Sequence, residues 1–234
     1  MNSLIQFKNV TKEYVTGSKK LLAADNINFS INQGEFVVIL GPSGAGKSTV
    51  LNLLGGMDSA TSGDIIINGQ NIAKYNEQQL TSFRAENVGF VFQFYNLIPT
   101  LTALENVALI KNIVKAPLDA EDVLVSVGLE DHLRKFPSEL SGGEQQRVSI
   151  ARAICKNPMM LLCDEPTGAL DSETGTIILS LLQKLSREQK KTVIIVTHNA
   201  ALAQAADKVI HLKNGKVRDI SLIETPLSVS EVNW

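Results

Sequence analysis

Short apolar runs alternate along the chain with longer segments in which hydrophobic residues recur at a helical spacing. The runs at 36–40, 159–163 and 192–196 are almost continuously apolar, which is typical of strands covered on both faces of a parallel sheet. Helical patterns at 48–54 and 174–189 lie between them. This alternation predicts an α/β fold with a parallel-sheet core.

A region at the N-terminus is expected to form an antiparallel β subdomain beside this core. Strand patterns at 4–7 and 27–31 are followed by a turn at 32–34, and another strand is expected at 65–67. A closing hairpin is expected at 209–217.

The middle of the chain, from about residue 77 to 157, is mostly helical in pattern and predicts a helical subdomain inserted into the core. The remainder of residues 1–220 would then form one domain around it. Residues 221–234 are weakly patterned, and we expect them to form a poorly fixed C-terminal tail. Within the inserted subdomain, helices are expected at 77–86, 103–115, 119–127 and 141–156.

Composition and charge exclude several classes of protein. The 234 residues are 44% hydrophobic and 20% charged, as in ordinary globular proteins, and the formal net charge is −2. That charge gives no indication of nucleic-acid binding. The apolar runs are too short to span a bilayer, and the first residues do not resemble a signal peptide, so we expect a soluble chain. Cys155 and Cys163 lack a C-x-x-C spacing and are expected to be reduced core residues.

A phosphate-binding loop lies between the strand at 36–40 and the helix at 48–54. Its pattern is G-x-x-x-x-G-K-S, in which backbone N–H groups and a helix N-terminus approach phosphate oxygens. Lys47 would add a full charge, and the Ser48 hydroxyl would bind Mg²⁺. An accidental glycine-rich turn is the alternative, but the strand–loop–helix context argues against it. The loop residues are Gly41, Pro42, Ser43, Gly44, Ala45, Gly46, Lys47, Ser48 and Thr49.

Two adjacent carboxylates follow the buried strand at 159–163. Ligands of open parallel sheets bind at the carboxyl ends of the strands. Asp164 would therefore hold the hydrated Mg²⁺, and Glu165 could polarise an attacking water. Alternatively, the pair is a helix-capping acid with a solvated neighbour before Pro166.

A second anion-binding helix start lies at Leu140-Ser141-Gly142-Gly143-Glu144-Gln145. With the phosphate loop, this motif resembles the signature of the ATP-binding subunits of ABC transporters, and the resemblance covers about residues 4–218. It implies a P-loop NTPase that hydrolyses ATP with Mg²⁺. It also implies that Ser141, Gly142 and Gly143 meet the γ-phosphate held by a second copy of the chain, so that the active unit is a homodimer. A plain capping box of Ser141 and Glu144 is compatible with that role.

The resemblance assigns further residues one at a time. Gln93 matches the glutamine that contacts Mg²⁺ and water, and His198 matches the switch histidine at the γ-phosphate. Asp171 lies in the loop that crosses the dimer interface, where Gly168 replaces the commoner serine. Tyr14 matches the aromatic residue that stacks on adenine, although a lone tyrosine in a strand can simply pack.

The segment 94–107 resembles the branch that serves lipoprotein release, macrolide or peptide export and cell-division regulation. This implies a permease partner with few membrane helices and a large external domain, and a peripheral position on the cytoplasmic face of the cell membrane. Signalling at the cell envelope without transport is the alternative. ABC ATPases of translation or DNA repair are disfavoured, because the sequence has no second phosphate loop, no sustained heptads and no basic stripe. We therefore expect no nucleic-acid partner.

Overall fold

Two β-sheets form the framework of the chain, for which a computed structural model describes residues 3–17 and 19–232. Residues 1–2, 18 and 233–234 lie outside this description, and with them the start of the expected 1–220 domain and the end of the expected tail. The larger sheet has the order β10-β9-β3-β8-β7-β6, and its neighbours are parallel except for β10 and β9. Its strands are β3 (Phe36–Leu40), β6 (Val88–Val91), β7 (Met160–Asp164), β8 (Thr192–Thr197), β9 (Lys208–Lys213) and β10 (Lys216–Leu222).

Strand β3 explains why the central runs are almost continuously apolar. Its side chains alternate between two hydrophobic cores, with Phe36 and Val38 in one and Val37 and Ile39 in the other. All four side chains are fully buried. A strand between two cores has no solvent-facing side, so its sequence is apolar throughout.

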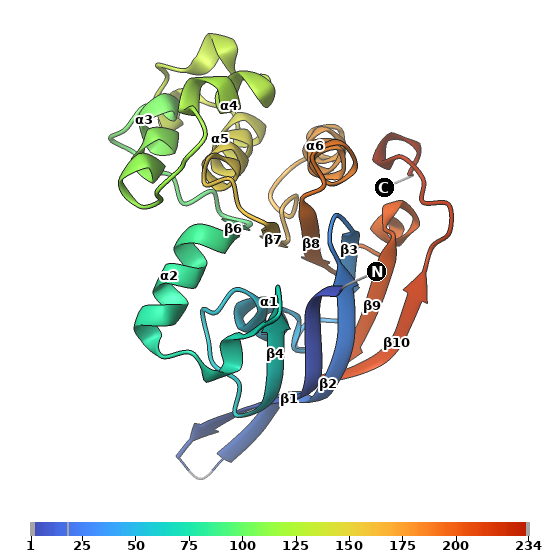
Figure 1. Cartoon of the computed structure of the whole chain (residues 1–234). Helices are drawn as coiled ribbons and strands as arrows, with labels where there is room; N and C mark the ends of the chain where they lie inside the picture. The colour runs from blue at the N-terminus through green and yellow to red at the C-terminus, as the bar shows by residue number, and fades with distance from the viewer. Residues whose placement is uncertain (1–2, 18, 233–234) are drawn as a thin grey trace.

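The smaller sheet has the order β2-β1-β4-β5 with antiparallel pairing, as predicted for the N-terminal region. It packs with α1 (Lys47–Leu54) into one of the two cores. The β1–β2 hairpin projects away from the rest of the molecule (Figure 1). The strands are β1 (Ser3–Thr16), β2 (Lys19–Asn32), β4 (Ser62–Ile67) and β5 (Gln70–Asn71).

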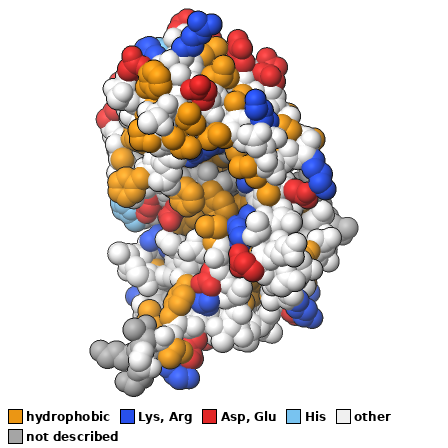
Figure 2. Space-filling model, turned by 90° about the vertical axis from the view of Figure 1, so that its left-hand side faces the viewer, with side chains coloured by type: hydrophobic (Ala, Val, Ile, Leu, Met, Phe, Trp, Pro, Cys, Tyr) orange, Lys and Arg blue, Asp and Glu red, His pale blue; other side chains and the backbone are white. Residues whose placement is uncertain are grey.

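Helices form a lobe at the end of the molecule away from the hairpin (Figure 1). A hollow separates this lobe from the lower part of the face in Figure 2. No helix within the described residues combines the length and hydrophobicity needed to cross a membrane. The remaining helices are α2 (Glu77–Asn87), α3 (Ala103–Ala108), α4 (Ala120–Ser126), α5 (Gly142–Cys155) and α6 (Ser172–Gln189), with short 3₁₀ turns between and after them.

The expected α/β architecture is confirmed, with its parallel core, antiparallel N-terminal sheet and inserted helical part. The expected helix over 103–115 is wrong beyond Ala108, where a 3₁₀ turn (Leu109–Asn112) takes over. The next residues include β-branched Ile113 and Val114 and lead to Pro117, a sequence with weak helix propensity. Strand β6 lies within 77–157 but belongs to the larger sheet.

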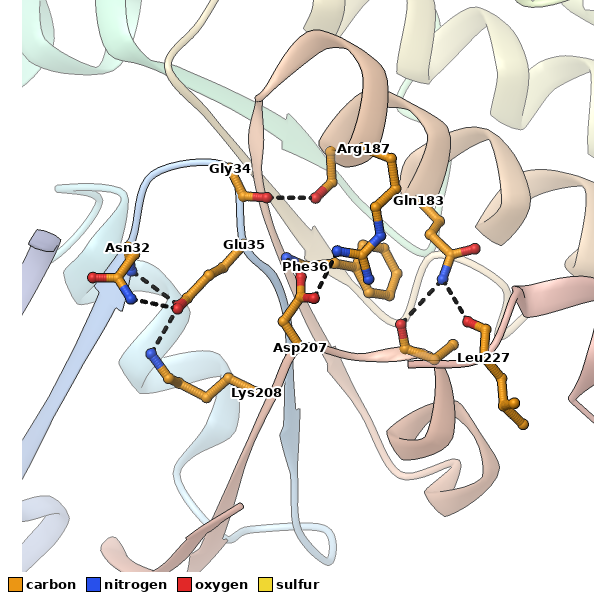
Figure 3. Close-up of polar contacts among 11 residues, drawn as sticks. Asn32, Gly34, Glu35, Phe36, Gln183, Arg187, Asp207, Lys208 and Leu227 are labelled. Carbon is orange, nitrogen blue, oxygen red and sulfur yellow. Dashed lines mark hydrogen bonds and ion pairs between the residues drawn. The ribbon is translucent and has the colours of Figure 1, made fainter. Parts of the chain in front are cut away.

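Residues 221–222 end strand β10 and the segment after them is docked on α6, so the expectation of a poorly fixed tail is wrong over residues 221–232. Val229 and Val232 are buried. Gln183 of α6 donates from Nε2 to the carbonyl oxygens of Ala205 (3.1 Å) and Leu227 (2.9 Å) (Figure 3). Its Oε1 accepts the Val229 N–H at 3.1 Å. The sequence pattern was weak because side-chain-to-backbone hydrogen bonds, rather than a periodic element, hold this segment.

A polar network beside this contact fixes the amino ends of β3 and β9 (Figure 3). Asp207 accepts the Phe36 N–H at 2.8 Å and pairs with Arg187 at 2.6 Å. Lys208 is buried and pairs with Glu35 at 2.8 Å. These bonds hold one end of the sheet and leave its carboxyl end free for a ligand.

We predict that Gln183→Leu lowers the free energy of unfolding by about 2–4 kcal/mol. The substitution leaves two carbonyl groups and one N–H without a partner, and each orphaned buried group costs about 1–3 kcal/mol unless water reaches it. Denaturant unfolding would measure the change. Gln189→Leu, the same change at an exposed position of α6, is the matched control and should shift stability by less than about 0.5 kcal/mol. If both substitutions changed the free energy of unfolding equally, Gln183 would not hold the C-terminal segment as described.

Candidate functional site

A cavity of about 1120 Å³ lies where β3, β7 and β8 end, the edge at which open parallel sheets bind ligands. The structure gathers most of the predicted site residues around it, although they come from distant parts of the chain. Gly41, Pro42 and Ala45 belong to the same loop without lining the cavity. The predicted residues that line it are Tyr14, Ser43, Gly44, Gly46, Lys47, Ser48, Thr49, Gln93, Asp164, Glu165 and His198.

The loop before α1 is shaped by glycines and closed by Lys47. Gly46 has a φ of 97°, in the left-handed region, and a Cβ there would overlap the carbonyl oxygen of Ala23. The Lys47 side chain is buried and folds back over the loop, where Nζ donates to the carbonyl oxygens of Gly41 (2.8 Å) and Pro42 (3.1 Å). The ammonium group therefore lies within the curve of the loop, above the N-terminus of α1.

Asp164 lies at the end of β7 beside Ser48. Burial raises the pKa of its carboxyl group, and the nearby Glu165 raises it further, while Ser48 and Lys47 oppose the shift. The carboxyl group of Asp164 and the hydroxyl of Ser48 thus present oxygen atoms side by side. Carboxylate and hydroxyl oxygens are hard donors of the kind that Mg²⁺ prefers.

Glu165 and His198, which the sequence suggested separately, are in direct contact. Oε1 of Glu165 lies 2.9 Å from His198 Nδ1, and Oε2 accepts the Thr197 hydroxyl at 3.0 Å. The backbone of Glu165 is left-handed, with a φ of 46°, which is uncommon for a residue other than glycine. Its N–H donates to Val196 O at 2.9 Å. The end of β8 therefore holds both the backbone and the carboxylate of Glu165.

Gln93 approaches the loop that contains Gly168. A Cβ on Gly168 would lie only 2.9 Å from Gln93 Nε2, so the lack of a side chain at this position leaves room for the glutamine.

Gln146 supports the site from behind the cavity lining and is not among the residues predicted from the sequence. It is fully buried, and Nε2 donates to the carbonyl oxygens of Pro166 (2.8 Å) and Phe92 (3.3 Å). It therefore joins α5 to the segments that carry Glu165 and Gln93. The signal was a polar residue in the apolar stripe of this helix, four positions before Ile150.

Arg152 of α5 is a second supporting residue that the sequence did not predict. It donates to Asn96 O (2.8 Å) and Tyr95 O (3.0 Å), just after Gln93. Helix α5 therefore contacts the chain on both sides of the cavity-lining residues Gln93 and Phe94.

Besides Gly41, Pro42 and Ala45, five predicted site residues lie outside the cavity lining. Ser141 and Glu144 form the expected capping box of α5: Ser141 N–H donates to Glu144 Oε2 at 2.7 Å, and Glu144 N–H donates to Ser141 Oγ at 3.3 Å. Asp171 caps α6 by accepting the Thr174 N–H at 2.9 Å. Gly142 and Gly143 open α5. The structure thus brings neither of these helix starts into the cavity of its own chain.

Comparisons with known proteins agree on one family. A family model described as ABC transporter matches residues 24–168. The chain is 46% identical over 219 residues to an uncharacterized ABC transporter ATP-binding protein of Mycobacterium tuberculosis, covering 92% of this chain and 88% of that protein. It is 45% identical over 223 residues to the uncharacterized ABC transporter ATP-binding protein MJ0796 of Methanocaldococcus jannaschii, covering 92% of this chain and 95% of that protein.

Solved structures agree with these sequence relatives. The chain resembles a dimeric structure of the ATP-binding cassette MJ0796 in a post-hydrolysis state bound to ADP and Pi, with a TM-score of 0.85 and 43% identity. The match covers 94% of this chain and 99% of that one. A second dimeric structure of MJ0796 gives a TM-score of 0.86 at the same identity and coverage.

Proposed function

The chain belongs to the ABC transporter family as an ATP-binding subunit, and on this premise we propose that it hydrolyses ATP in a homodimer that drives a membrane permease. The observation that carries the proposal is the convergence of the phosphate loop, Asp164, Glu165, Gln93 and His198 on one cavity. An anion-binding loop beside carboxylates at a strand end is the arrangement that phosphoryl transfer from a nucleotide requires.

In this proposal residues 41–49 hold the ATP polyphosphate. Backbone N–H groups of the loop and the positive end of α1 face the phosphates, and Lys47 neutralises charge near the β- and γ-phosphates. Tyr14 stacks on the adenine at the hairpin end of the cavity.

The donors present fit Mg²⁺. Ser48, Asp164 and Gln93 line one cavity and would supply oxygen ligands to the ion, and the described residues contain no cluster of three His, Cys, Asp or Glu side chains that could hold a metal by themselves. Such a site takes its other ligands from phosphate and water. When bound, the ion would neutralise charge that develops on the phosphates.

Glu165 is proposed as the general base that orients the attacking water, and His198 as the group that meets the γ-phosphate. Glu165 is held by Thr197 and His198 at 3.0 and 2.9 Å, so its carboxylate has a defined orientation at the cavity wall. A base positioned by neighbouring hydrogen bonds meets the geometric requirement for proton abstraction from water.

The remaining predicted residues are proposed to act on the ATP of a second copy. Ser141, Gly142 and Gly143 start a helix whose N–H groups can face an anion, with Glu144 fixing the cap, but they do not line the cavity of their own chain. Asp171 is proposed to cross the same interface. The dimeric state of the MJ0796 cassette bound to ADP and Pi supports this arrangement.

The permease partner is proposed to dock on the hollow between the helical lobe and the rest of the molecule. Hydrophobic side chains gather there in Figure 2. We further propose a permease with few membrane helices and a large external domain, and a peripheral position on the cytoplasmic face of the membrane. In that branch the work would be export, lipoprotein or peptide extrusion, or mechanical transmission. Regulation at the cell envelope without transport is the second candidate, because transport and regulation would use the same ATP-driven homodimer.

Lys47→Ala tests the proposed ATPase. We expect the purified chain to release phosphate from Mg-ATP, and the variant to lose at least about 100-fold in rate because the charge at the β- and γ-phosphates is gone. Lys184→Ala, which removes an exposed lysine of α6, is the control and should retain the wild-type rate. Equal hydrolysis by wild type and Lys47→Ala would refute the proposal.

A further inference from the structure

Tyr14 is held at the wall of the cavity by a residue from a different element. Its hydroxyl donates to Asp58 Oδ2 at 2.7 Å. Asp58 lies in the loop between α1 and β4, whereas Tyr14 is near the end of β1. Tyr14 is 36% exposed, so packing alone does not fix the ring, and this hydrogen bond contributes to its orientation.

Asp58 is itself held on its other oxygen. Lys12 Nζ lies 2.6 Å from Oδ1, and the Ser59 N–H donates to the same atom at 2.7 Å. Burial favours the neutral acid, but the hydrogen bonds from Lys12, Tyr14 and Ser59 together outweigh it and lower the pKa of Asp58. The acceptor of the Tyr14 hydroxyl is therefore a carboxylate, which forms stronger hydrogen bonds than a neutral group.

Lys12 also occupies one face of the aromatic ring. Its Nζ lies 4.9 Å from the ring centroid, within the range of a cation–π interaction. The opposite face is therefore the one left for a planar ligand. Leu21 and Leu22 line the same cavity and are 65% and 46% exposed, so apolar surface is available beside the ring.

The loop that carries Asp58 is tied to the helix that starts at the phosphate loop. Met57 N–H donates to Asn52 O at 2.9 Å, at the C-terminal end of α1, whose first residue is Lys47. A rigid helix thus connects Asp58 to the phosphate-binding residues. The hydrogen bond from Tyr14 to Asp58 extends this connection to the aromatic ring.

We propose that Asp58 is a positioning residue for nucleotide binding, which holds the Tyr14 ring at a fixed place relative to the phosphate loop so that the base stacks without first ordering the hairpin. The inference rests on the proposed function, in which Tyr14 meets the base. Fixing a binding group in its bound position raises affinity by lowering the ordering cost on binding. Asp58 then contributes to binding of the base and not to binding of the phosphates.

Calorimetric titration of the full chain with Mg-ADP and with Mg-pyrophosphate tests this, because only the first ligand carries a base. We expect Asp58→Ala and Tyr14→Phe each to weaken Mg-ADP binding by about 3–10-fold, the scale of one modest hydrogen-bond effect, and to change Mg-pyrophosphate binding by less than about twofold. The double variant should be no weaker than the weaker single variant, because both changes break the same hydrogen bond.

Glu13→Ala is the matched control, since it breaks an ion pair with Lys20 on the same hairpin, and both affinities should remain at wild-type values. Equal weakening of both ligands by Asp58→Ala and Tyr14→Phe would overturn the inference and assign Asp58 a purely structural role. If Asp58→Ala does not fold, Tyr14→Phe decides alone, because it keeps the ring and the Lys12–Asp58 pair. If wild type binds Mg-ADP no more tightly than Mg-pyrophosphate, the proposed stacking on Tyr14 fails instead.

Discussion

Glu165→Gln is expected to slow ATP hydrolysis by roughly 10²–10⁴-fold, the usual cost of removing a positioned general base. Glutamine has the size of glutamate and can still accept the Thr197 hydroxyl, which donates to Oε2 at 3.0 Å. It cannot take a proton from water. The substitution therefore removes the proposed chemistry while leaving the cavity wall in place.

Phosphate release and equilibrium ATP binding should be measured on the same preparation. We expect ATP affinity to be retained or increased, because the variant accumulates the state before hydrolysis. Glu188→Gln, an identical change at an exposed position of α6, should hydrolyse at the wild-type rate. Turnover of Glu165→Gln within a few-fold of wild type would assign the role of base to another group.

Mixing Lys47→Ala chains with Ser141→Arg chains should restore ATP hydrolysis that neither variant has alone. If each site takes its phosphate loop from one chain and its Ser141 helix start from the other, a mixed dimer has one intact site and one site with both defects. Random pairing of equal amounts then predicts about a quarter of the wild-type rate, since half of the dimers are mixed and each has one of two sites. Phosphate release as a function of mixing ratio measures this.

Ser141→Arg places a bulky cation at the proposed interface. It should leave the phosphate loop of its own chain unchanged, because Ser141 lies outside the cavity that Lys47 lines. Full activity of Ser141→Arg by itself would mean that each chain hydrolyses ATP without the helix start of a neighbour. A mixture as inactive as its components would mean that the two variants do not complement across an interface.

Strand β3 and the phosphate loop were predictable from the sequence because their physical requirements are local. A strand covered on both faces must be apolar at every position, and Phe36–Leu40 meets that requirement over its whole length. The loop pattern fixes where Lys47 must lie relative to α1. The position of Asp164 and Glu165 beside the loop also followed, since parallel strands end at one edge of the sheet, whereas His198 was assigned by the resemblance to a known family.

Long-range polar contacts were not predictable in the same way. The docking of residues 223–232 depends on Gln183, whose partners are backbone groups far along the chain. The hydrogen bond between Tyr14 and Asp58 likewise joins residues from separate elements without any local pattern. Gln146 was detectable as a polar residue on an apolar helix face, but its partners at Phe92 and Pro166 were not. The roles of Ser141 and Asp171 at a second copy remain predictions.

The central claim, that ATP joins two copies of the chain, is tested most directly by the mass of Glu165→Gln in solution. Sedimentation velocity should be measured with Mg-ATP, with Mg-ADP and without nucleotide, and repeated for the variant that also carries Ser141→Arg. The account predicts that Glu165→Gln forms a particle of twice the chain mass with Mg-ATP, but not with Mg-ADP or without nucleotide. The variant that also carries Ser141→Arg should stay at the mass of one chain in all three conditions. A chain that stays monomeric at saturating ATP, or that dimerises equally with ADP and with ATP, would contradict it.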